Sequence, residues 1–302
     1  LLMASGALVA MGLFPGLPTA PFLLIGGGIG YAAWNLRKRQ DAELVRSESD
    51  VRPAAPRENL ESLLKVEPLA IEVGLGLVKL VEGGANSPLL RRIAGIRRQM
   101  ASQLGYLLPA VRVTDNLSLK VRDYAVLLKG IEVARYELLQ GCELAIPPRS
   151  GIAPANASPA VEPAFGIPAF WVPSDQAERL RAEGYTVVDS VSVLGTHVSE
   201  LAKRHAHEIF TRQDAKKVLD RIAEENPKLV EDLVPKLVPL GAVQKVFQNL
   251  LRERVSIRDA STILEAISEA AAVTRNPVLT TEYARQAIRR SVVLPYLNSN
   301  NE

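Results

Sequence analysis

The sequence predicts an α+β multidomain region with a helical C-terminal subdomain, preceded by a transmembrane helical hairpin. Residues 1–36 carry no charged side chain, and Arg37, Lys38 and Arg39 follow them directly. Between residues 60 and 189, short apolar runs of strand length are mixed with segments of helical period. Beyond about Val191, one segment after another follows the helical period. These observations give the order of the parts: an apolar hairpin, an α+β region and a helical end.

The charge distribution points to a membrane edge. The 36 Lys and Arg residues exceed the 33 Asp and Glu residues by three, which gives the net charge of +3. Arg37, Lys38 and Arg39 account for this whole excess, so the rest of the chain is charge-balanced. A protein that follows nucleic-acid phosphates spreads several basic groups over a surface patch. We therefore predict a membrane partner and no nucleic acid.

The apolar N-terminal region divides into two segments, residues 1–14 and 19–36, around the turn sequence Pro-Gly-Leu-Pro. The second segment is about 27 Å long as a helix, close to the hydrocarbon thickness of a bilayer. Tyr31 and Trp34 lie near its charged end, where interfacial aromatic residues are typical. A signal peptide would carry its positive charge before the apolar stretch. We predict a transmembrane hairpin with a basic stop at residues 1–39, with a buried globular helix pair or a signal remnant as the alternatives.

The residues after Arg39 are expected to face the cytoplasm by the positive-inside rule. A single cysteine, Cys142, fits a reducing compartment and excludes an internal disulfide. Residues 40–59 are rich in charged residues, Ser and Pro and have few apolar side chains, so we predict a flexible linker there.

The first α+β part is expected over residues 60–147 and 190–210. It contains predicted strands at 69–75 and 111–114 and a hairpin, 124–128 and 131–136, about Lys129-Gly130. A helix is predicted over 87–104, with Ser87 as its cap, Pro88 in its first turn and Gly105 at its end.

A second domain, residues 148–189, is predicted as an insertion into the first, because a proline-rich stretch at 147–162 separates two α+β patterns. It should contain a strand at 165–172, a helix at 174–183 capped by Ser174, and a strand at 185–188. A helical third domain is expected over 211–294, and residues 295–302 would begin a further domain. The predicted helices from 191 onward are 196–210, 213–225, 228–233, 242–254, 259–270 and 281–294. Ser256 with Asp259 resembles a capping box.

No catalytic pattern emerges from the sequence. It has no phosphate-binding loop outside the apolar segment, no CxxC and no HExxH. His205 and His207 are two residues apart on a predicted helix, so they point to different faces and cannot chelate one metal as i and i+4 ligands do. We predict no enzyme activity, no cofactor and no metal. A membrane-tethered DNA-binding regulator that uses residues 255–290 remains an alternative.

Several strings together resemble one family in order and spacing: GIRRQ at 95–99, VRVTDNL at 111–117, KGIEVAR at 129–135, EPAFG at 162–166, GYTVVD at 184–189, TH at 196–197, PKLVEDLVP at 227–235, VFQNLLRE at 246–253 and IRD at 257–259. This is the FHIPEP (FlhA/LcrD) family, the export-gate component of flagellar and virulence type III secretion systems. The resemblance extends from the apolar hairpin to about residue 290.

The resemblance implies a multi-pass protein of the bacterial inner membrane with a cytoplasmic C-terminal region. That region would form a homo-oligomeric, nine-subunit ring that receives export substrates and their chaperones. The ring would work with other export-apparatus proteins, including a separate ATPase complex. By the same resemblance, earlier membrane helices precede Leu1 and a last cytoplasmic domain follows Glu302. The strings at 186–189 and 246–253 favour the flagellar branch, and the virulence branch is the alternative.

The resemblance also implies a docking groove for chaperones and substrates, whose matching residues are Glu162, Phe165, Val188 and Thr196. An exposed aromatic side chain would supply apolar burial, while a carboxylate and a hydroxyl would orient the partner. The competing interpretation is that Phe165 is a core strand residue and Glu162 a solvated loop group.

Overall fold

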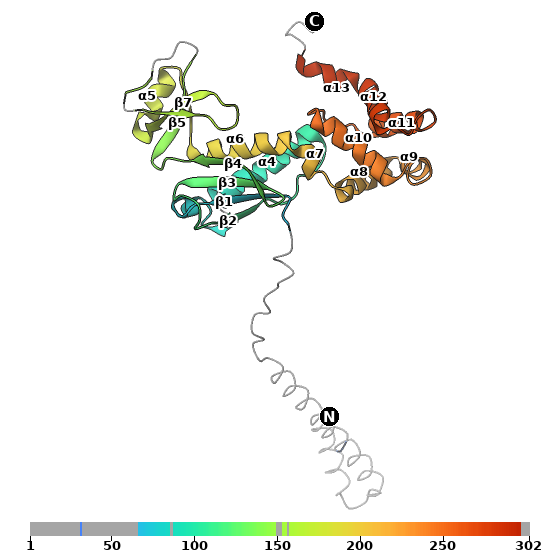
Figure 1. Ribbon diagram of the computed structural model, residues 1–302, viewed down its shortest axis with the longest axis horizontal. Coiled ribbons are helices and arrows are strands. Elements are labelled where there is room, and N and C mark those ends of the chain that lie inside the picture. The colour runs from blue at the N-terminus through green and yellow to red at the C-terminus, as the bar shows by residue number, and fades with distance from the viewer. Residues whose placement is uncertain (1–30, 32–65, 85–86, 149–152, 156, 297–302) are drawn as a thin grey trace, which may run out of the picture. The chain divides into compact units, whose positions relative to one another are not determined.

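The computed structural model describes residue 31 and residues 66–84, 87–148, 153–155 and 157–296 (Figure 1). The chain divides into two compact units, Leu1–Lys65 and Val66–Glu302, and the fold below is that of the second unit. The predicted hairpin and linker lie outside the described residues, apart from Tyr31. Among the helices that are described, none is both long enough and apolar enough to cross a membrane.

The first sheet has four strands in the order β2-β1-β3-β4. They are β1 (Leu69–Val73), β2 (Arg112–Asp115), β3 (Asp123–Leu128) and β4 (Ile131–Glu137). β1 and β2 are parallel, and the chain between them contains a 3-10 turn, η1 (Leu75–Leu80), and helix α4 (Pro88–Leu104). β3 and β4 form the predicted hairpin, in which Lys129 and Gly130 take positive φ angles of 50° and 81°. Two left-handed residues match the twist of a tight hairpin.

Helix α4 confirms the predicted helix and both of its ends. The Ser87 hydroxyl accepts a hydrogen bond from the Leu90 amide at 3.1 Å, Pro88 is the first helical residue, and Gly105 ends the helix at φ 87°. Helix α6 (Ser190–Arg204) packs against α4, and both helices lie on the same side of the first sheet (Figure 1). The pair covers a continuous core that includes β1 and β3.

The second sheet is antiparallel, with the order β6-β7-β5-β8. Its strands are β5 (Cys142–Ile146), β6 (Ser158–Val161), β7 (Pro168–Pro173) and β8 (Thr186–Val188), and helix α5 (Ala177–Ala182) joins β7 to β8. One face of this sheet, with Leu144, Ala169 and Trp171, belongs to the main core. The other face packs against Leu180 of α5 in a small separate core.

The strand pairing bears on the domain boundaries. β5 was included in the first domain, which we predicted to extend to residue 147, but it hydrogen-bonds to β7 and β8 of the second sheet. The division into an interrupted first domain and an inserted second one stays a prediction. Strand pairing favours starting the insertion at Cys142.

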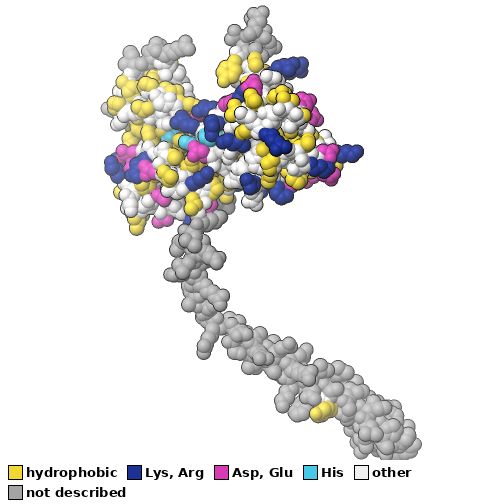
Figure 2. Space-filling model, turned by 45° about the vertical axis from the view of Figure 1, so that its right-hand side comes forward, with side chains coloured by type: hydrophobic (Ala, Val, Ile, Leu, Met, Phe, Trp, Pro, Cys, Tyr) yellow, Lys and Arg dark blue, Asp and Glu magenta, His cyan; other side chains and the backbone are white. Residues whose placement is uncertain are grey.

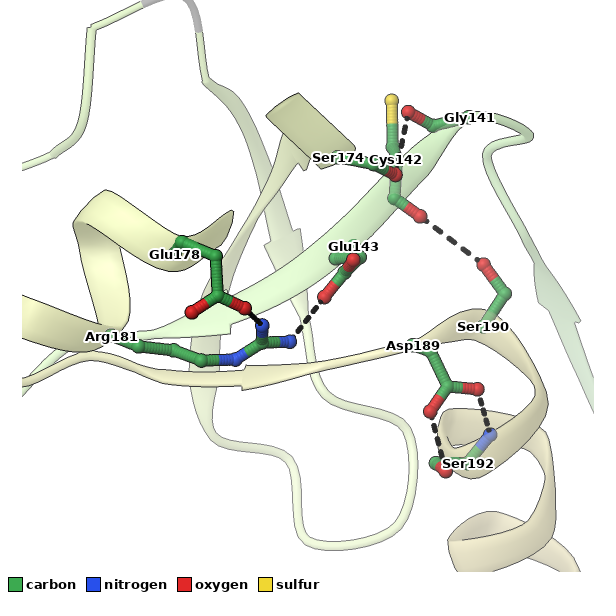
Figure 3. Close-up of polar contacts among 9 residues, drawn as sticks. All are labelled: Gly141, Cys142, Glu143, Ser174, Glu178, Arg181, Asp189, Ser190 and Ser192. Atoms are coloured by element: carbon green, nitrogen blue, oxygen red, sulfur yellow. Dashed lines mark hydrogen bonds and ion pairs between the residues drawn. The ribbon is translucent and has the colours of Figure 1, made fainter. Parts of the chain in front are cut away.

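Two expected features of this region are wrong. Ser174 does not cap a helix: its hydroxyl donates to the Gly141 carbonyl at 3.1 Å, and α5 begins only at Ala177, after a 3-10 turn (Figure 3). The strand predicted from Phe165 begins at Pro168. The preceding residues form a tight turn, because the Glu162 carboxylate holds two of their amide groups.

The helical end contains α7 (Ala206–Ile209), α8 (Arg212–Glu225), α9 (Pro227–Leu233), α10 (Leu240–Arg252), α11 (Ala260–Ala271), α12 (Pro277–Ala287) and α13 (Arg289–Val293), followed by the turn η4 (Leu294–Tyr296). The prediction of a helical end is confirmed, but three of its details are wrong. The helix predicted over 196–210 starts at Ser190, because Asp189 caps it, and is divided into α6 and α7 at His205. The capping box lies at Thr211 and Asp214, whereas Asp259 is itself a cap. The helix predicted over 281–294 is divided into α12 and α13.

Candidate functional site

The turn between β6 and β7 is built around a buried carboxylate. Glu162 is only 5% exposed, and its two oxygens accept hydrogen bonds from the Ala164 amide at 3.0 Å and the Phe165 amide at 2.8 Å. Its own amide donates to the Ile167 carbonyl at 2.8 Å. Gly166 follows with φ 71°, a left-handed conformation that glycine adopts without steric cost. The turn is therefore fixed by side-chain and backbone bonds together.

Phe165 stands at the tip of this turn with 62% of its surface exposed. Both parts of the competing interpretation therefore fail: Phe165 is not a core strand residue, and Glu162 is not a solvated loop group. The structure also changes the expected role of Glu162. Because both of its oxygens already bind backbone amides, Glu162 shapes the turn that presents Phe165.

The turn rests against the first sheet through Tyr136 of β4. The Tyr136 hydroxyl donates to the Val161 carbonyl at 2.8 Å, one residue before Glu162. Its ring centroid lies 6.5 Å from that of Trp171 in β7 and 6.2 Å from that of Tyr124 in β3. Burial raises the pKa of Tyr136, and the Glu162 carboxylate raises it further against an opposing hydrogen bond with Trp171. The aromatic side chains thus connect the second sheet to the first.

Tyr124 extends this connection to helix α6. Its hydroxyl oxygen lies 2.7 Å from Nδ1 of His197, and both side chains are buried. Burial raises the pKa of Tyr124 well above its usual value, with smaller contributions from Tyr136 and Glu162. The hydroxyl therefore stays protonated and is the hydrogen-bond donor to Nδ1. Burial, followed by the nearby Arg204 charge, lowers the pKa of His197 to about 4. At neutral pH the imidazole is uncharged and carries its proton on Nε2.

Thr196 precedes His197 on α6 and is half-buried. The chain therefore links all the elements in series: the Phe165 turn contacts Tyr136, Tyr136 packs on Tyr124, and Tyr124 bonds to the helix that carries Thr196. This series connects the turn that carries Phe165 to the helix that carries Thr196, and its last contact, the Tyr124–His197 bond, is buried.

Val188 has a different position from the other predicted site residues. It ends β8, pairs with Leu144 of β5 and packs against the main core while remaining half-buried. β5 lies between β8 and β7, so Val188 is about 10 Å from β7 across the sheet, given the usual strand spacing. Its packing is that of an interface residue between the second sheet and the main core.

Sequence reasoning missed Tyr124, Tyr136 and Trp171 and treated the histidines as ordinary polar residues. One signal was present, since both tyrosines lie in the predicted hairpin. However, a regular hairpin about Lys129-Gly130 would pair Tyr124 with Arg135. A register shift after Val126 instead pairs the two tyrosines directly. A bulge of this kind adds one residue to one strand and re-aims the side chains beyond it.

The other crossing between the sheets lies where β5 begins and α6 starts (Figure 3). The Ser190 hydroxyl donates to the Cys142 carbonyl at 3.3 Å, while Asp189 accepts hydrogen bonds from both the amide and the hydroxyl of Ser192. On the far side of β5, Arg181 of α5 binds Glu143 at 2.7 Å. These contacts tie the start of β5 to α6 on one side and to α5 on the other.

The described part of the chain has no group of three or more His, Cys, Asp or Glu side chains arranged to hold a metal ion. Figure 2 shows histidine side chains on a surface that also carries basic and acidic side chains. His205 Nδ1 lies 2.8 Å from Glu208 Oε1, so this histidine is engaged in a local pair. The absence of a cofactor and of a metal stays a prediction.

We expect Glu162→Ala to loosen the turn locally without unfolding the sheet. The change removes the acceptors of two amides, and an unmade hydrogen bond of this kind costs about 1–3 kcal/mol. Amide hydrogen exchange at Ala164 and Phe165 should become about 10- to 100-fold faster, because the turn opens at correspondingly lower free energy. Glu162→Gln keeps one oxygen acceptor and should show a smaller change. Equal exchange in all three proteins would contradict the role assigned to Glu162.

Comparison with known proteins shows which family the chain resembles in sequence. The FHIPEP family model matches residues 1–302. The chain is 34% identical over 307 residues to the flagellar biosynthesis protein FlhA of Proteus mirabilis, and 36% identical over 309 residues to that of Escherichia coli K12. Each alignment covers 100% of this chain and 44% of the relative, so the chain spans less than half the length of these curated relatives.

Solved structures share the fold of the described unit. The structure of the Chlamydia pneumoniae CdsV protein matches with a TM-score of 0.68 at 25% identity, over 79% of this chain and 69% of that one. The cryo-EM structure of nonameric EPEC SctV-C matches with a TM-score of 0.60 at 19% identity, over 78% of this chain and 69% of that one, and shows likeness of fold alone. With a family model that matches its whole length, this chain belongs to the FHIPEP family.

Proposed function

We propose that this chain is part of the membrane-anchored export-gate component of a flagellar type III protein export apparatus, and that it docks export substrates and chaperone–substrate complexes for translocation. The observation that carries the proposal is the exposed Phe165 on a turn fixed by a buried glutamate, in a chain of the FHIPEP family. The role is one of binding and not of catalysis. The protein acts at the bacterial inner membrane, with residues 40–302 in the cytoplasm.

Phe165 is the anchor of the docking site. An aromatic side chain buries a large apolar area and loses little conformational freedom, which is why aromatic residues often dominate binding energy. Thr196 offers a hydroxyl beside the buried Tyr124–His197 pair. Val188 contributes through the packing of β8 against the main core. Glu162 acts on the partner indirectly, by holding the Phe165 turn.

The flagellar branch has the better support. Relatives named flagellar biosynthesis protein FlhA, from eight bacteria, are 33–36% identical over nearly all of this chain. The solved structures, including one described as part of the type III secretion system, are 19–26% identical. The virulence-type gate is the second candidate, because the folds agree.

We further propose that the cytoplasmic region assembles as a homo-oligomeric ring. EPEC SctV-C and the EscV cytosolic domain, which share the fold, are both nonameric. The Chlamydia CdsV protein is also known in complex with the CdsO protein, which supports other export-apparatus proteins as partners here. The DNA-binding alternative has less support, because the family match and the relatives named FlhA favour the export gate over the whole chain.

The test of this proposal is the affinity of the 302-residue chain for a flagellar export chaperone loaded with its substrate. Phe165→Ala should weaken binding about 30-fold, since loss of a central aromatic anchor typically costs about 2 kcal/mol. Leu117→Ala is the matched control, because Leu117 is an exposed aliphatic residue at 78% on a loop of the first sheet. Calorimetric titration gives both values. The proposal fails if Phe165→Ala binds as tightly as the Leu117→Ala control.

A further inference from the structure

The carbonyl of Val161 points away from its own hairpin. β6 is an edge strand, and Val161 is the register partner of Pro168. In antiparallel strands, hydrogen-bonded and non-hydrogen-bonded pairs alternate. Because the Glu162 amide donates to Ile167, the next pair, Val161 with Pro168, is of the non-bonded kind. Val161 therefore presents its carbonyl at the open edge of the second sheet.

Tyr136 supplies the donor for this edge carbonyl from the other sheet. Its hydroxyl bonds to the Val161 oxygen at 2.8 Å, and its half-buried ring is held between Tyr124 and Trp171. Because the ring is packed on two sides, its orientation is restricted, and the hydroxyl is held in hydrogen-bonding position to the Val161 carbonyl. This is a direct polar bond from the first sheet to the residue that precedes the Phe165 turn.

We propose that Tyr136 is a positioning residue of the docking site: its hydroxyl holds the edge of β6 and thereby fixes the position of the turn that exposes Phe165. This inference rests on the proposed docking function. Phe165 is the group that contacts the partner, whereas Tyr136 acts through the turn. In the absence of the hydroxyl, the turn keeps its internal bonds to Glu162 but loses its attachment to β4.

The Tyr136 hydroxyl should contribute little to the free energy of unfolding. The Val161 carbonyl lies at an exposed sheet edge, where water can replace the lost donor. The ring contacts with Tyr124 and Trp171 are unchanged in Tyr136→Phe. The variant should therefore fold normally, and its effect should appear in the freedom of the turn and in binding.

The first test uses the unbound 302-residue chain. Tyr136→Phe should increase the hydrogen exchange rate of the Phe165 amide at least threefold, because the turn opens more often once its attachment to β4 is lost. Tyr283→Phe, which removes a hydroxyl from α12, should leave that rate unchanged. An unchanged rate at Phe165 in Tyr136→Phe would overturn the proposal, whatever the partner of the chain is.

The second test is a double-mutant cycle on binding of the chaperone–substrate complex. Tyr136→Phe should weaken binding about fivefold in the native chain and should have no effect in a Phe165→Ala background. A fivefold loss in both backgrounds, or in neither, would contradict a positioning role. If Phe165→Ala alone left affinity unchanged, the docking function would fail, and the exchange measurement would still decide whether Tyr136 holds the turn.

Discussion

Gly105→Ala should destabilise the chain by more than about 3 kcal/mol, because it combines backbone strain with a close backbone contact. Gly105 ends α4 at φ 87°, a conformation that costs an alanine about 1 kcal/mol. A Cβ atom at this position would also lie 2.3 Å from the backbone nitrogen and Cα of Arg258. Backbone atoms cannot rotate away as a side chain can, so the segment must move.

That segment joins the helical end to α4. The Ile257 amide donates to the Leu104 carbonyl at 2.9 Å, and Ile257 itself is fully buried. Displacing it would break this bond and disturb the main core, to which both Ile257 and Leu104 belong.

Gly184→Ala is the matched control for Gly105→Ala. Gly184 has φ 89°, but no atom lies within 4 Å of the position that a Cβ would take. Gly184→Ala should therefore lower the free energy of unfolding only by the conformational cost of the left-handed backbone, about 1 kcal/mol. Urea unfolding of the three proteins measures both values. Equal destabilisation by the two substitutions would show that the contact with the Arg258 backbone does not destabilise Gly105→Ala.

His197 should make the chain less stable at acidic pH. The unfolded chain binds a proton at this side chain below its ordinary pKa of 6.5, whereas the folded chain binds it only below about 4, mainly because of burial. The unfolded state therefore holds more protons between these values, and stability falls as the pH falls through this window. At pH 5 the loss relative to pH 8 should be about 2 kcal/mol from this group.

His197→Gln separates this contribution from those of other titrating groups. The glutamine keeps a polar acceptor for the Tyr124 hydroxyl but does not titrate. We expect the variant to be less stable than the native chain at pH 8 and to lose about 2 kcal/mol less on transfer to pH 5. Urea unfolding at the two pH values measures the difference. Parallel losses in both proteins would mean that His197 titrates normally in the folded state.

The elements that could be predicted are those whose ends are decided by neighbours in the chain. Ser87, Pro88 and Gly105 specify α4 within a few residues, and the structure confirms each role. The hairpin about Lys129-Gly130 was recognised for the same reason. Where a distant group competes, prediction failed: the hydroxyl of Ser174 is taken by the Gly141 carbonyl, so it caps no helix.

The residues of the candidate site came from the family resemblance and stay a prediction, and their geometry could not be derived from the sequence. The family resemblance identified Glu162 and Phe165, and chain order alone could not reveal that the glutamate is buried and bound to the amides of the turn. The contribution of Tyr136 depends on a register shift in β4 and on the edge of another sheet. Both are tertiary features, which the local pattern of apolar residues does not encode.

The most direct test of the central claim is photo-crosslinking from the tip of the turn. With p-benzoyl-phenylalanine in place of Phe165, irradiation of the chain mixed with a flagellar export chaperone–substrate complex should yield a covalent adduct with that complex. The same residue in place of Leu117 should yield none, and excess native chain should suppress the adduct at 165 by competition. Adducts of equal yield from both positions, or none from 165 under conditions in which the complex binds, would contradict docking at this turn.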